Sequence, residues 1–419
     1  MMKRLMLLIF ALALLVGMGV ATSAAMAGDV DGELWWRWTG WNNLDDLDGD
    51  NDDAFAYAMM RARINLSGEF DGGYYKIGLQ DYFDFGTWDY DIEYWHEGVY
   101  SEDLDVYEAN FTLTDFLFEG FDATAGRMQL AYGRERVIGT DDWNFEHEIF
   151  FDGFKGHYTM EKGWLDLLCL KLYESGDDKY WDSDGQGDTD MRGAYFHYDA
   201  MPELYFEPYA LLITSENWEA EGDPEVDNTK MWTFGALVDY QKDSFHFYGE
   251  GTLMSGTDEL SGTDISSNAF YAGLFYDFDS EYNPYIGFEY NMASGQDDSD
   301  DMTAYYAPFA SRHDFMGMMD IAEQFGESTW TDIQAMRFAG GFTPTENLDV
   351  SLDYFMFTEA EVDDGDEDDI GAELDIKLDY MYRDDVHFEG GLGMFMPGDM
   401  LGDDADSVIF GFLGTKVLF

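Results

Sequence analysis

A strict two-residue periodicity near the C-terminus constrains the fold of this chain more than any other feature. From Ile370 to Tyr380, apolar residues occupy every even position, and glycine or charged residues occupy every odd position. Successive side chains of a β-strand point to opposite faces, so this period predicts a strand with one apolar and one polar face. After a polar turn at 383–385 the alternation resumes and continues to Met396. The stretch is therefore an amphipathic hairpin, with strands of about ten residues that are long enough to cross a bilayer at a tilt.

The N-terminus has the pattern of a secretory signal. Lys3 and Arg4 precede an apolar run over 5–20, and small residues follow up to Ala27. We expect a signal peptide at 1–27 and one β-barrel domain at 28–419. No later stretch offers roughly 20 consecutive apolar residues, so a membrane-embedded form of this chain would have to cross with strands.

The charge balance excludes some partners. The chain has 21 Lys+Arg against 88 Asp+Glu, a formal net charge of −67. Such an acidic chain is a poor partner for nucleic acid. Solvated acidic loops or adaptation to a salty habitat explain the charge better than a specific cation-binding role. The single cysteine, Cys169, excludes an intrachain disulfide and is expected to be a small packed residue on a strand.

Period-two alternation recurs along the whole mature chain and predicts an all-β fold. Hydrophobic residues make up 46% of the chain but are spread by alternation instead of being gathered into apolar helices. We count about 18 strands, with 16 as the alternative, both even numbers within the range of bacterial outer-membrane barrels. The expected strands lie near 34–38, 61–70, 74–85, 103–113, 119–131, 150–160, 164–174, 191–199, 203–214, 230–241, 244–254, 268–278, 282–293, 331–343, 347–358, 370–381, 385–396 and 407–419.

The connections between these strands alternate in length. Short turns are expected at 71–73, 160–163, 200–202, 241–244, 343–347 and 382–384. Long, mostly acidic segments lie between them, at 42–53, 86–102, 175–190, 215–229, 294–330, 360–369 and 397–406. Short periplasmic turns alternating with long extracellular loops are typical of a transmembrane antiparallel up-and-down β-barrel.

The last strand is expected to close the barrel. It ends in Phe419, with Leu413 and Val417 on the same face. This strand resembles the terminal strand of outer-membrane proteins, whose final Phe is read by the barrel assembly machinery. Pairing it with the first strand would leave no edge, as a sheet in hydrocarbon requires.

Two blocks of sequence resemble the alginate-export family of outer-membrane barrels. The first comprises GRMQLAYG at 126–133, RVIG at 136–139, DW at 142–143 and FDGF at 151–154. The second comprises RHDFMGMMD at 312–320, AGGFTP at 339–344, LDY at 352–354 and GAELD at 371–375. The resemblance covers most of the mature chain and implies an 18-stranded barrel that passes a solute through its lumen.

Strand parity selects the candidate pore-lining residues. The polar faces carry nine basic side chains, which we expect to point inward: Arg37, Arg61, Arg63, Lys76, Arg127, Lys155, Lys171, Arg337 and Lys377. These cations would meet a permeating solute. The alternative is that they are paired with lumenal acids such as Glu69, Asp375 and Asp379, because charges inside a barrel usually neutralise one another.

Two loops carry candidates for a constriction. Loop 132–148 contains Arg134 and Arg136, and we weigh a loop that folds back into the pore against an outer loop held by salt bridges. The longest loop, 294–330, contains Arg312 and His313 and a Met-rich stretch that could narrow the lumen, since long loops of this kind are usually functional or disordered.

Neither a metal site nor a catalytic site is predicted. The Asp-rich stretches at 45–53 and 182–190 offer oxygen ligands that suit calcium, but neither has the full EF-hand spacing. The seven histidines are scattered, and neither a Gly-x-Ser-x-Gly nor a His-Glu-x-x-His motif occurs. We expect no cofactor and no enzymatic activity.

The sequence therefore predicts a channel in the outer membrane of a Gram-negative bacterium. Its outer face would contact lipid and lipopolysaccharide, and small solutes or ions would pass through an aqueous lumen. One alternative is a selective exporter of an acidic polysaccharide such as alginate. A second is an acidic soluble or surface β protein that binds a ligand or a metal.

Overall fold

The described residues form one antiparallel sheet of 18 strands. The computed structural model describes residues 28–44, 47, 54–85, 104–145, 148–173, 186–217, 227–258, 262–297, 299–307, 309–311, 313, 315–321, 331–362, 367–402 and 405–419. The strands are β1 (Gly28–Asn42), β2 (Phe55–Phe70), β3 (Gly73–Phe85), β4 (Asp105–Leu113), β5 (Phe121–Met128), β6 (Phe151–Met160), β7 (Gly163–Tyr173), β8 (Gln186–Met201), β9 (Leu204–Asn217), β10 (Asp227–Lys242), β11 (Phe245–Asp258), β12 (Thr263–Asp277), β13 (Tyr285–Ala293), β14 (Ile333–Thr345), β15 (Leu348–Glu359), β16 (Asp369–Arg383), β17 (Val386–Pro397) and β18 (Val408–Leu418). A short 3-10 helix, η1 (Asp399–Leu401), precedes β18.

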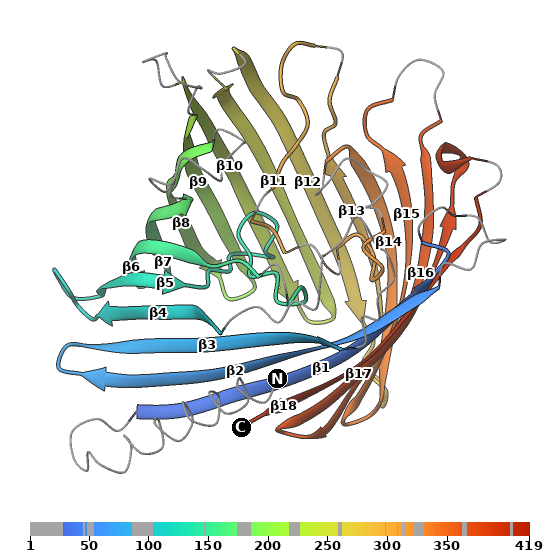
Figure 1. The fold of residues 1–419 in the computed structure, drawn as a ribbon, viewed down its shortest axis with the longest axis horizontal. Coiled ribbons are helices and arrows are strands. Elements are labelled where there is room, and N and C mark those ends of the chain that lie inside the picture. Colours follow the sequence, from blue (N-terminus) through green and yellow to red (C-terminus); the bar gives the residue numbers. More distant parts are fainter. Residues whose placement is uncertain are drawn as a thin grey trace.

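The sheet closes on itself. Each strand pairs with its sequence neighbours, and β1 pairs with β18 on one side and β2 on the other (Figure 1). At the seam, the Gly32 amide donates to the Phe419 carbonyl over 2.8 Å and the Phe419 amide donates back to Gly32 over 3.0 Å. Closure leaves no strand edge unpaired, which is the condition for a sheet in hydrocarbon. The expected up-and-down barrel of 18 strands is confirmed, and the count of 16 is wrong.

The two faces of the barrel wall differ as the periodicity predicts. On β16, Glu373 and Asp375 are 0% and 4% exposed, whereas Leu374 and Ile376 are 37% and 43% exposed. The charged row therefore faces the interior and the apolar row faces outward. The first strand repeats the arrangement, with Arg37 buried and neighbouring apolar side chains exposed. Charged side chains inside and apolar side chains outside are typical of a barrel whose outer surface contacts lipid.

Connection lengths alternate between the two ends of the barrel. The connections at one end are 71–72, 114–120, 161–162, 202–203, 243–244, 278–284, 346–347 and 384–385. At the other end they are 43–54, 86–104, 129–150, 174–185, 218–226, 259–262, 294–332, 360–368 and 398–407. Only 259–262 is short on this second side. No helix in the described part of the chain is long and apolar enough to cross a membrane.

Two local expectations were wrong. Strand β5 ends at Met128, three residues before the predicted end at 131, because the chain leaves the wall there and Leu130 and Tyr132 pack inside the barrel. Cys169 is exposed and not packed against protein. It lies two residues from Leu167 on the outward face of β7, where a side chain has no protein neighbour to cover it.

Candidate functional site

Two long connections enter the barrel and meet there. We call the described residues of the connection 129–150 the first inward loop and those of the connection 294–332 the second inward loop. Their backbones are joined by a parallel bridge between Ile138 and Phe309, in which the Gly139 amide donates to the Phe309 carbonyl over 2.6 Å. Ser311 adds two bonds to Glu135, from its amide to the backbone carbonyl over 3.0 Å and from its hydroxyl to the carboxylate over 2.5 Å. The two loops therefore form one unit across the lumen.

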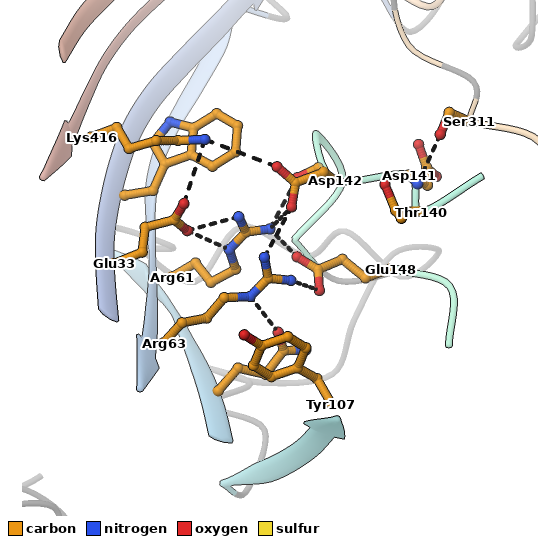
Figure 2. A network of polar contacts seen from close by, with 12 residues as sticks. Glu33, Arg61, Arg63, Tyr107, Thr140, Asp141, Asp142, Glu148, Ser311 and Lys416 are labelled. Atoms are coloured by element: carbon orange, nitrogen blue, oxygen red, sulfur yellow. Dashed lines mark hydrogen bonds and ion pairs between the residues drawn. The ribbon is translucent and has the colours of Figure 1, made fainter. Parts of the chain in front are cut away.

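An ion-pair network fastens the first inward loop to β1 and β2. Arg61, which is 0% exposed, donates to Glu33 over 2.7 Å, lies 2.9 Å from an Asp142 oxygen and contacts Glu148 (Figure 2). Arg63 shares both loop carboxylates, with Asp142 at 3.0 Å and a contact to Glu148. Two arginines from one strand thus hold two acids from one loop. Charge-assisted bonds of this kind are stronger than neutral ones.

Neighbouring side chains complete this network. The Lys416 ammonium lies 3.5 Å from Glu33 and 3.9 Å from Asp142, so β18 contributes a third cation (Figure 2). The same ammonium lies 3.5 Å from the centroid of the Trp35 ring, close enough for a cation–π interaction. Burial raises the pKa of the Asp142 carboxyl, but the charges of Arg61 and Arg63 outweigh that effect and hold the pKa below its ordinary value.

The first inward loop is also tied to other parts of the wall. Arg136 donates to Glu289 of β13 over 2.9 Å, and both side chains are almost fully buried. The hydroxyl of Tyr132 donates to Asp166 of β7 over 2.7 Å. Since Glu289 and Asp166 lie on strands distant from β2, the loop spans the interior instead of lining one side of it.

The acidic row of β16 anchors the second inward loop. The amides of Met318 and Met319 donate to Asp375 over 3.0 Å and to Glu373 over 2.9 Å. Gly317 precedes them with a φ of +94°, and a Cβ there would collide with the Glu373 carboxylate. The apolar side chains of this loop pack with inward aromatic residues of the wall: Met316, Met318, Met319, Ile321, Phe355, Phe357, Phe395, Phe410 and Phe412.

An aromatic stack joins the two loops. The rings of Trp143 and His313 lie 4.0 Å apart with an interplanar angle of 3°. The Arg37 guanidinium lies 3.7 Å from the centroid of the same Trp143 ring. The Nδ1 atom of His313 lies 3.0 Å from Asp320 within the second loop. Trp143 therefore links a wall arginine to the second loop.

Two cavities lie beside the described parts of the inward loops. The first has a volume of ≈420 Å³ and reaches Thr343 and Asp349, near the short connection between β14 and β15. The second has a volume of ≈460 Å³. Arg134, Phe315 and Lys377 line both cavities. The lining that the two cavities share therefore contains a guanidinium and an ammonium.

Arg134 differs from the other arginines of the interior. Its guanidinium lies 3.6 Å from the centroid of the Tyr248 ring. Within the described part of the chain, no ion pair is formed between Arg134 and a carboxylate. Arg134 is therefore the cation that is best placed to meet a solute where the cavities adjoin.

Most of the basic residues selected by strand parity have inward side chains with acidic partners. Arg61 and Arg63 pair with the loop acids described above, whereas the Arg37 guanidinium lies on the Trp143 ring. Lys76 contacts Glu108, Lys155 lies 3.9 Å from Asp166, and Arg337 lies 2.9 Å from Asp353 and 3.8 Å from Glu289. Lys377 lines both cavities. The alternative of pairing within the lumen thus describes most of these cations.

Arg127 and Lys171 do not point inward, contrary to the prediction. Arg127 stands opposite Ala109 and Asp152, whose faces carry the exposed Phe111 and Phe154 two residues further on. It lies 2.7 Å from Asp152.

Lys171 shares the outward face of Cys169 and lies 3.2 Å from Asp188 and 3.1 Å from Asp190. Arg127 and Lys171 both lie near the long-loop ends of their strands, where an outward charge meets water or lipid headgroups at little cost.

Some predicted positions lie outside the residues that the structure describes, and the sequence did not single out some residues of the site. Arg312 and most of the Asp-rich stretches at 45–53 and 182–190 lie outside the described residues, among which no cluster of potential metal ligands occurs. Sequence reasoning missed Lys416, Glu33 and Glu289. Strand parity could have found Lys416, which shares the inward face of β18 with Phe410 and Phe412.

Solved structures with the same fold support the description of the barrel. OpdO from Pseudomonas aeruginosa has a TM-score of 0.62 at 12% identity, covering 94% of this chain and 97% of that one. OccAB1 from Acinetobacter baumannii has a TM-score of 0.61 at 10% identity, covering 93% and 96%. OccK11 from Pseudomonas aeruginosa has a TM-score of 0.57 at 12% identity, covering 93% and 96%. At these identities the similarity establishes the fold.

Sequence comparison identifies the family. No curated protein matches the chain. The sequence model described as alginate export matches residues 99–409, which is well over half of the chain. This match includes both blocks whose resemblance to the family was noted in the sequence. The chain therefore belongs to the alginate export family.

Proposed function

We propose that the protein is an outer-membrane channel through which small solutes or ions pass passively. The observation that carries the proposal is a closed 18-stranded wall, apolar outside and charged inside, with two cavities around loops that enter the lumen. A barrel of 16 to 18 strands is wide enough to leave an aqueous channel. The inward loops would reduce that width and make the passage selective.

The proposal includes a cellular setting. Residues 1–27 would export the chain across the inner membrane of a Gram-negative bacterium. The outward apolar rows would then contact outer-membrane lipid and lipopolysaccharide. Phe419, whose backbone pairs with Gly32 at the seam, would be the residue read by the barrel assembly machinery.

The positions of the inward basic residues suggest their roles in the passage. Arg37, Arg61 and Arg63 would fix the inward loops to the wall, because their charges are committed to loop groups. Arg134 and Lys377 would contact the solute where the cavities adjoin. Lys76, Lys155 and Arg337 would form part of the lumenal lining. Passage of this kind requires no catalytic group.

Family membership supports a second candidate, the selective export of an acidic polysaccharide. A polyanion would need unpaired cations along its route, since a narrow pore selects ions through the charges on its wall. Most inward cations of the described strands already have acidic partners. Passive passage of small solutes therefore fits the interior better.

Two measurements test the channel. The purified protein in detergent should migrate differently in electrophoresis before and after boiling, because a closed barrel resists unfolding by detergent alone. Liposomes that contain the protein should then swell in iso-osmotic solutions of small sugars, and more slowly as the sugar becomes larger. A protein that shows no heat-dependent shift and that salt washes from membranes would refute the channel.

A further inference from the structure

Four of the inward arginines are concealed from the passage. Arg61, Arg37, Arg136 and Arg63 are 0%, 3%, 4% and 8% exposed. Each guanidinium is covered by a carboxylate, an aromatic ring or both. The charges of these four arginines are therefore largely hidden from the surface that a solute would touch.

Carboxylates lie on the inner face in a row across three neighbouring strands. The register places Asp349 of β15 opposite Asp379 of β16, and Asp379 opposite Glu389 of β17. Asp349 and Asp379 are exposed, and both line the first cavity. Glu389 lines the second cavity and accepts a 2.5 Å hydrogen bond from the Trp35 indole. This acidic row therefore connects the two cavities.

A second acidic pair reinforces the row. Asp353 of β15 stands opposite Asp375 of β16, with Lys377 and Ser351 at the intervening position. Like charges directly opposite one another on a sheet are destabilising. Arg337 and the Met318 amide offset this cost for Asp353 and Asp375. The Thr343 hydroxyl, which is neutral, donates to the Asp349 carboxylate over 2.7 Å, and Asp349 is exposed, so its charge can act on ions in the cavity.

The lining of both cavities has an excess of acids. The first cavity is lined by Glu289 and four aspartates, namely Asp349, Asp353, Asp375 and Asp379, against Arg134, Arg337 and Lys377. The second is lined by Glu135, Asp141, Asp142 and Glu389 against Arg134 and Lys377. Each lining thus has two more acids than bases. Arg136, which pairs with Glu289, and Arg61 and Arg63, which pair with Asp142, lie behind the linings. Acidic rings of this kind attract cations and repel anions in narrow water-filled pores.

We propose that the passage selects cations over anions and that the acidic row Asp349–Asp379–Glu389 is the main source of this preference. The inference rests on the proposed channel and specifies its substrate class as inorganic cations and small cationic solutes. If the electrostatic energy of a monovalent cation in the passage is about −1 kT, the cation concentration there rises about threefold and the anion concentration falls by the same factor. The expected permeability ratio of potassium to chloride is then roughly sevenfold.

The reversal potential in a planar bilayer under a potassium chloride gradient measures this ratio. The wild type should show cation preference, and the double variant Asp349→Asn with Asp379→Asn should lose most of it. The matched control is Asp243→Asn with Glu281→Gln, which removes two acids from exposed short connections at the same end of the barrel. The control should behave like the wild type.

Each outcome has a separate meaning. Stepwise currents with anion preference would overturn the inference and leave the channel intact, whereas the absence of current would overturn the channel itself. Cation preference that survives in the Asp349→Asn, Asp379→Asn variant would overturn the role of the acidic row. Heat-dependent electrophoretic migration of every variant would establish that each barrel had folded.

Discussion

Substitution of Glu148 by Gln tests whether the ion pairs of Arg61 and Arg63 hold the first inward loop in the lumen. Gln has the size of Glu but lacks its charge, so the substitution leaves two arginines with one fewer acid. The Glu148 side chain is 2% exposed and that of Arg61 is 1% exposed, so water cannot readily replace the lost partner. Removal of one partner from a buried ion pair typically costs about 3–5 kcal/mol.

The lower end of that range applies here. Arg61 retains Glu33 at 2.7 Å and Asp142 at 2.9 Å, and Arg63 retains Asp142 at 3.0 Å. A loss of about 3 kcal/mol lowers the ratio of docked to undocked loop by about 100-fold, at 1.4 kcal/mol for each factor of ten. The loop would then leave the lumen far more often than in the wild type.

Single-channel recording detects this change. Glu148→Gln should increase the mean conductance and the open-channel noise, because the end of the first inward loop that Arg61 and Arg63 hold is then released from β2 more often. The control is Asp152→Asn, which breaks the ion pair with Arg127 on the outward face. Asp152→Asn should leave conductance unchanged. If both variants conduct like the wild type, the ion pairs do not position the loop.

Three further perturbations have defined outcomes. Gly317→Ala should displace the second inward loop and raise conductance, since φ is +94° and the new Cβ would strike Glu373; wild-type conductance would contradict the anchoring of that loop. The pKa of Asp142 is lower in the docked loop than the ordinary carboxyl pKa of about 4, so its charge stabilises the docked loop above that pH, and this stabilisation is lost as pH falls through the pKa of the docked state. Conductance noise should therefore rise on acidification. A fall in noise would contradict the stabilising role of the Asp142 charge. Arg127→Glu should leave the reversal potential unchanged and lower thermal stability by about 1 kcal/mol or less, because the lost pair with Asp152 is partly exposed; a shifted reversal potential would place Arg127 in the lumen.

The wall of the barrel could be predicted from the sequence because the alternation that forms each strand is contained within that strand. A strand in this fold needs only apolar residues at one parity and polar residues at the other, and Leu374, Glu373 and Asp375 obey that rule without reference to any partner. Loop lengths are equally local. The 18 strands and their alternating connections can therefore be predicted from the sequence.

The interior could not be predicted in the same way. Arg61 and Glu148 are 87 positions apart, and no sequence period relates a loop carboxylate to a distant strand. To predict the acidic row, one would need the registers of β15 with β16 and of β16 with β17, and these depend on the geometry of the connections. Parity was unreliable where a strand nears the membrane surface, and Arg127 and Lys171 were misassigned because charge there is tolerated on either face.

The most direct test of the channel is a planar-bilayer recording of the purified, folded protein at fixed voltage. We predict discrete, stable current steps, because the proposed passage runs through a closed barrel whose wall fixes its size. A protein that inserts into the bilayer and shows the heat-dependent electrophoretic shift, but produces no current steps, would contradict this prediction.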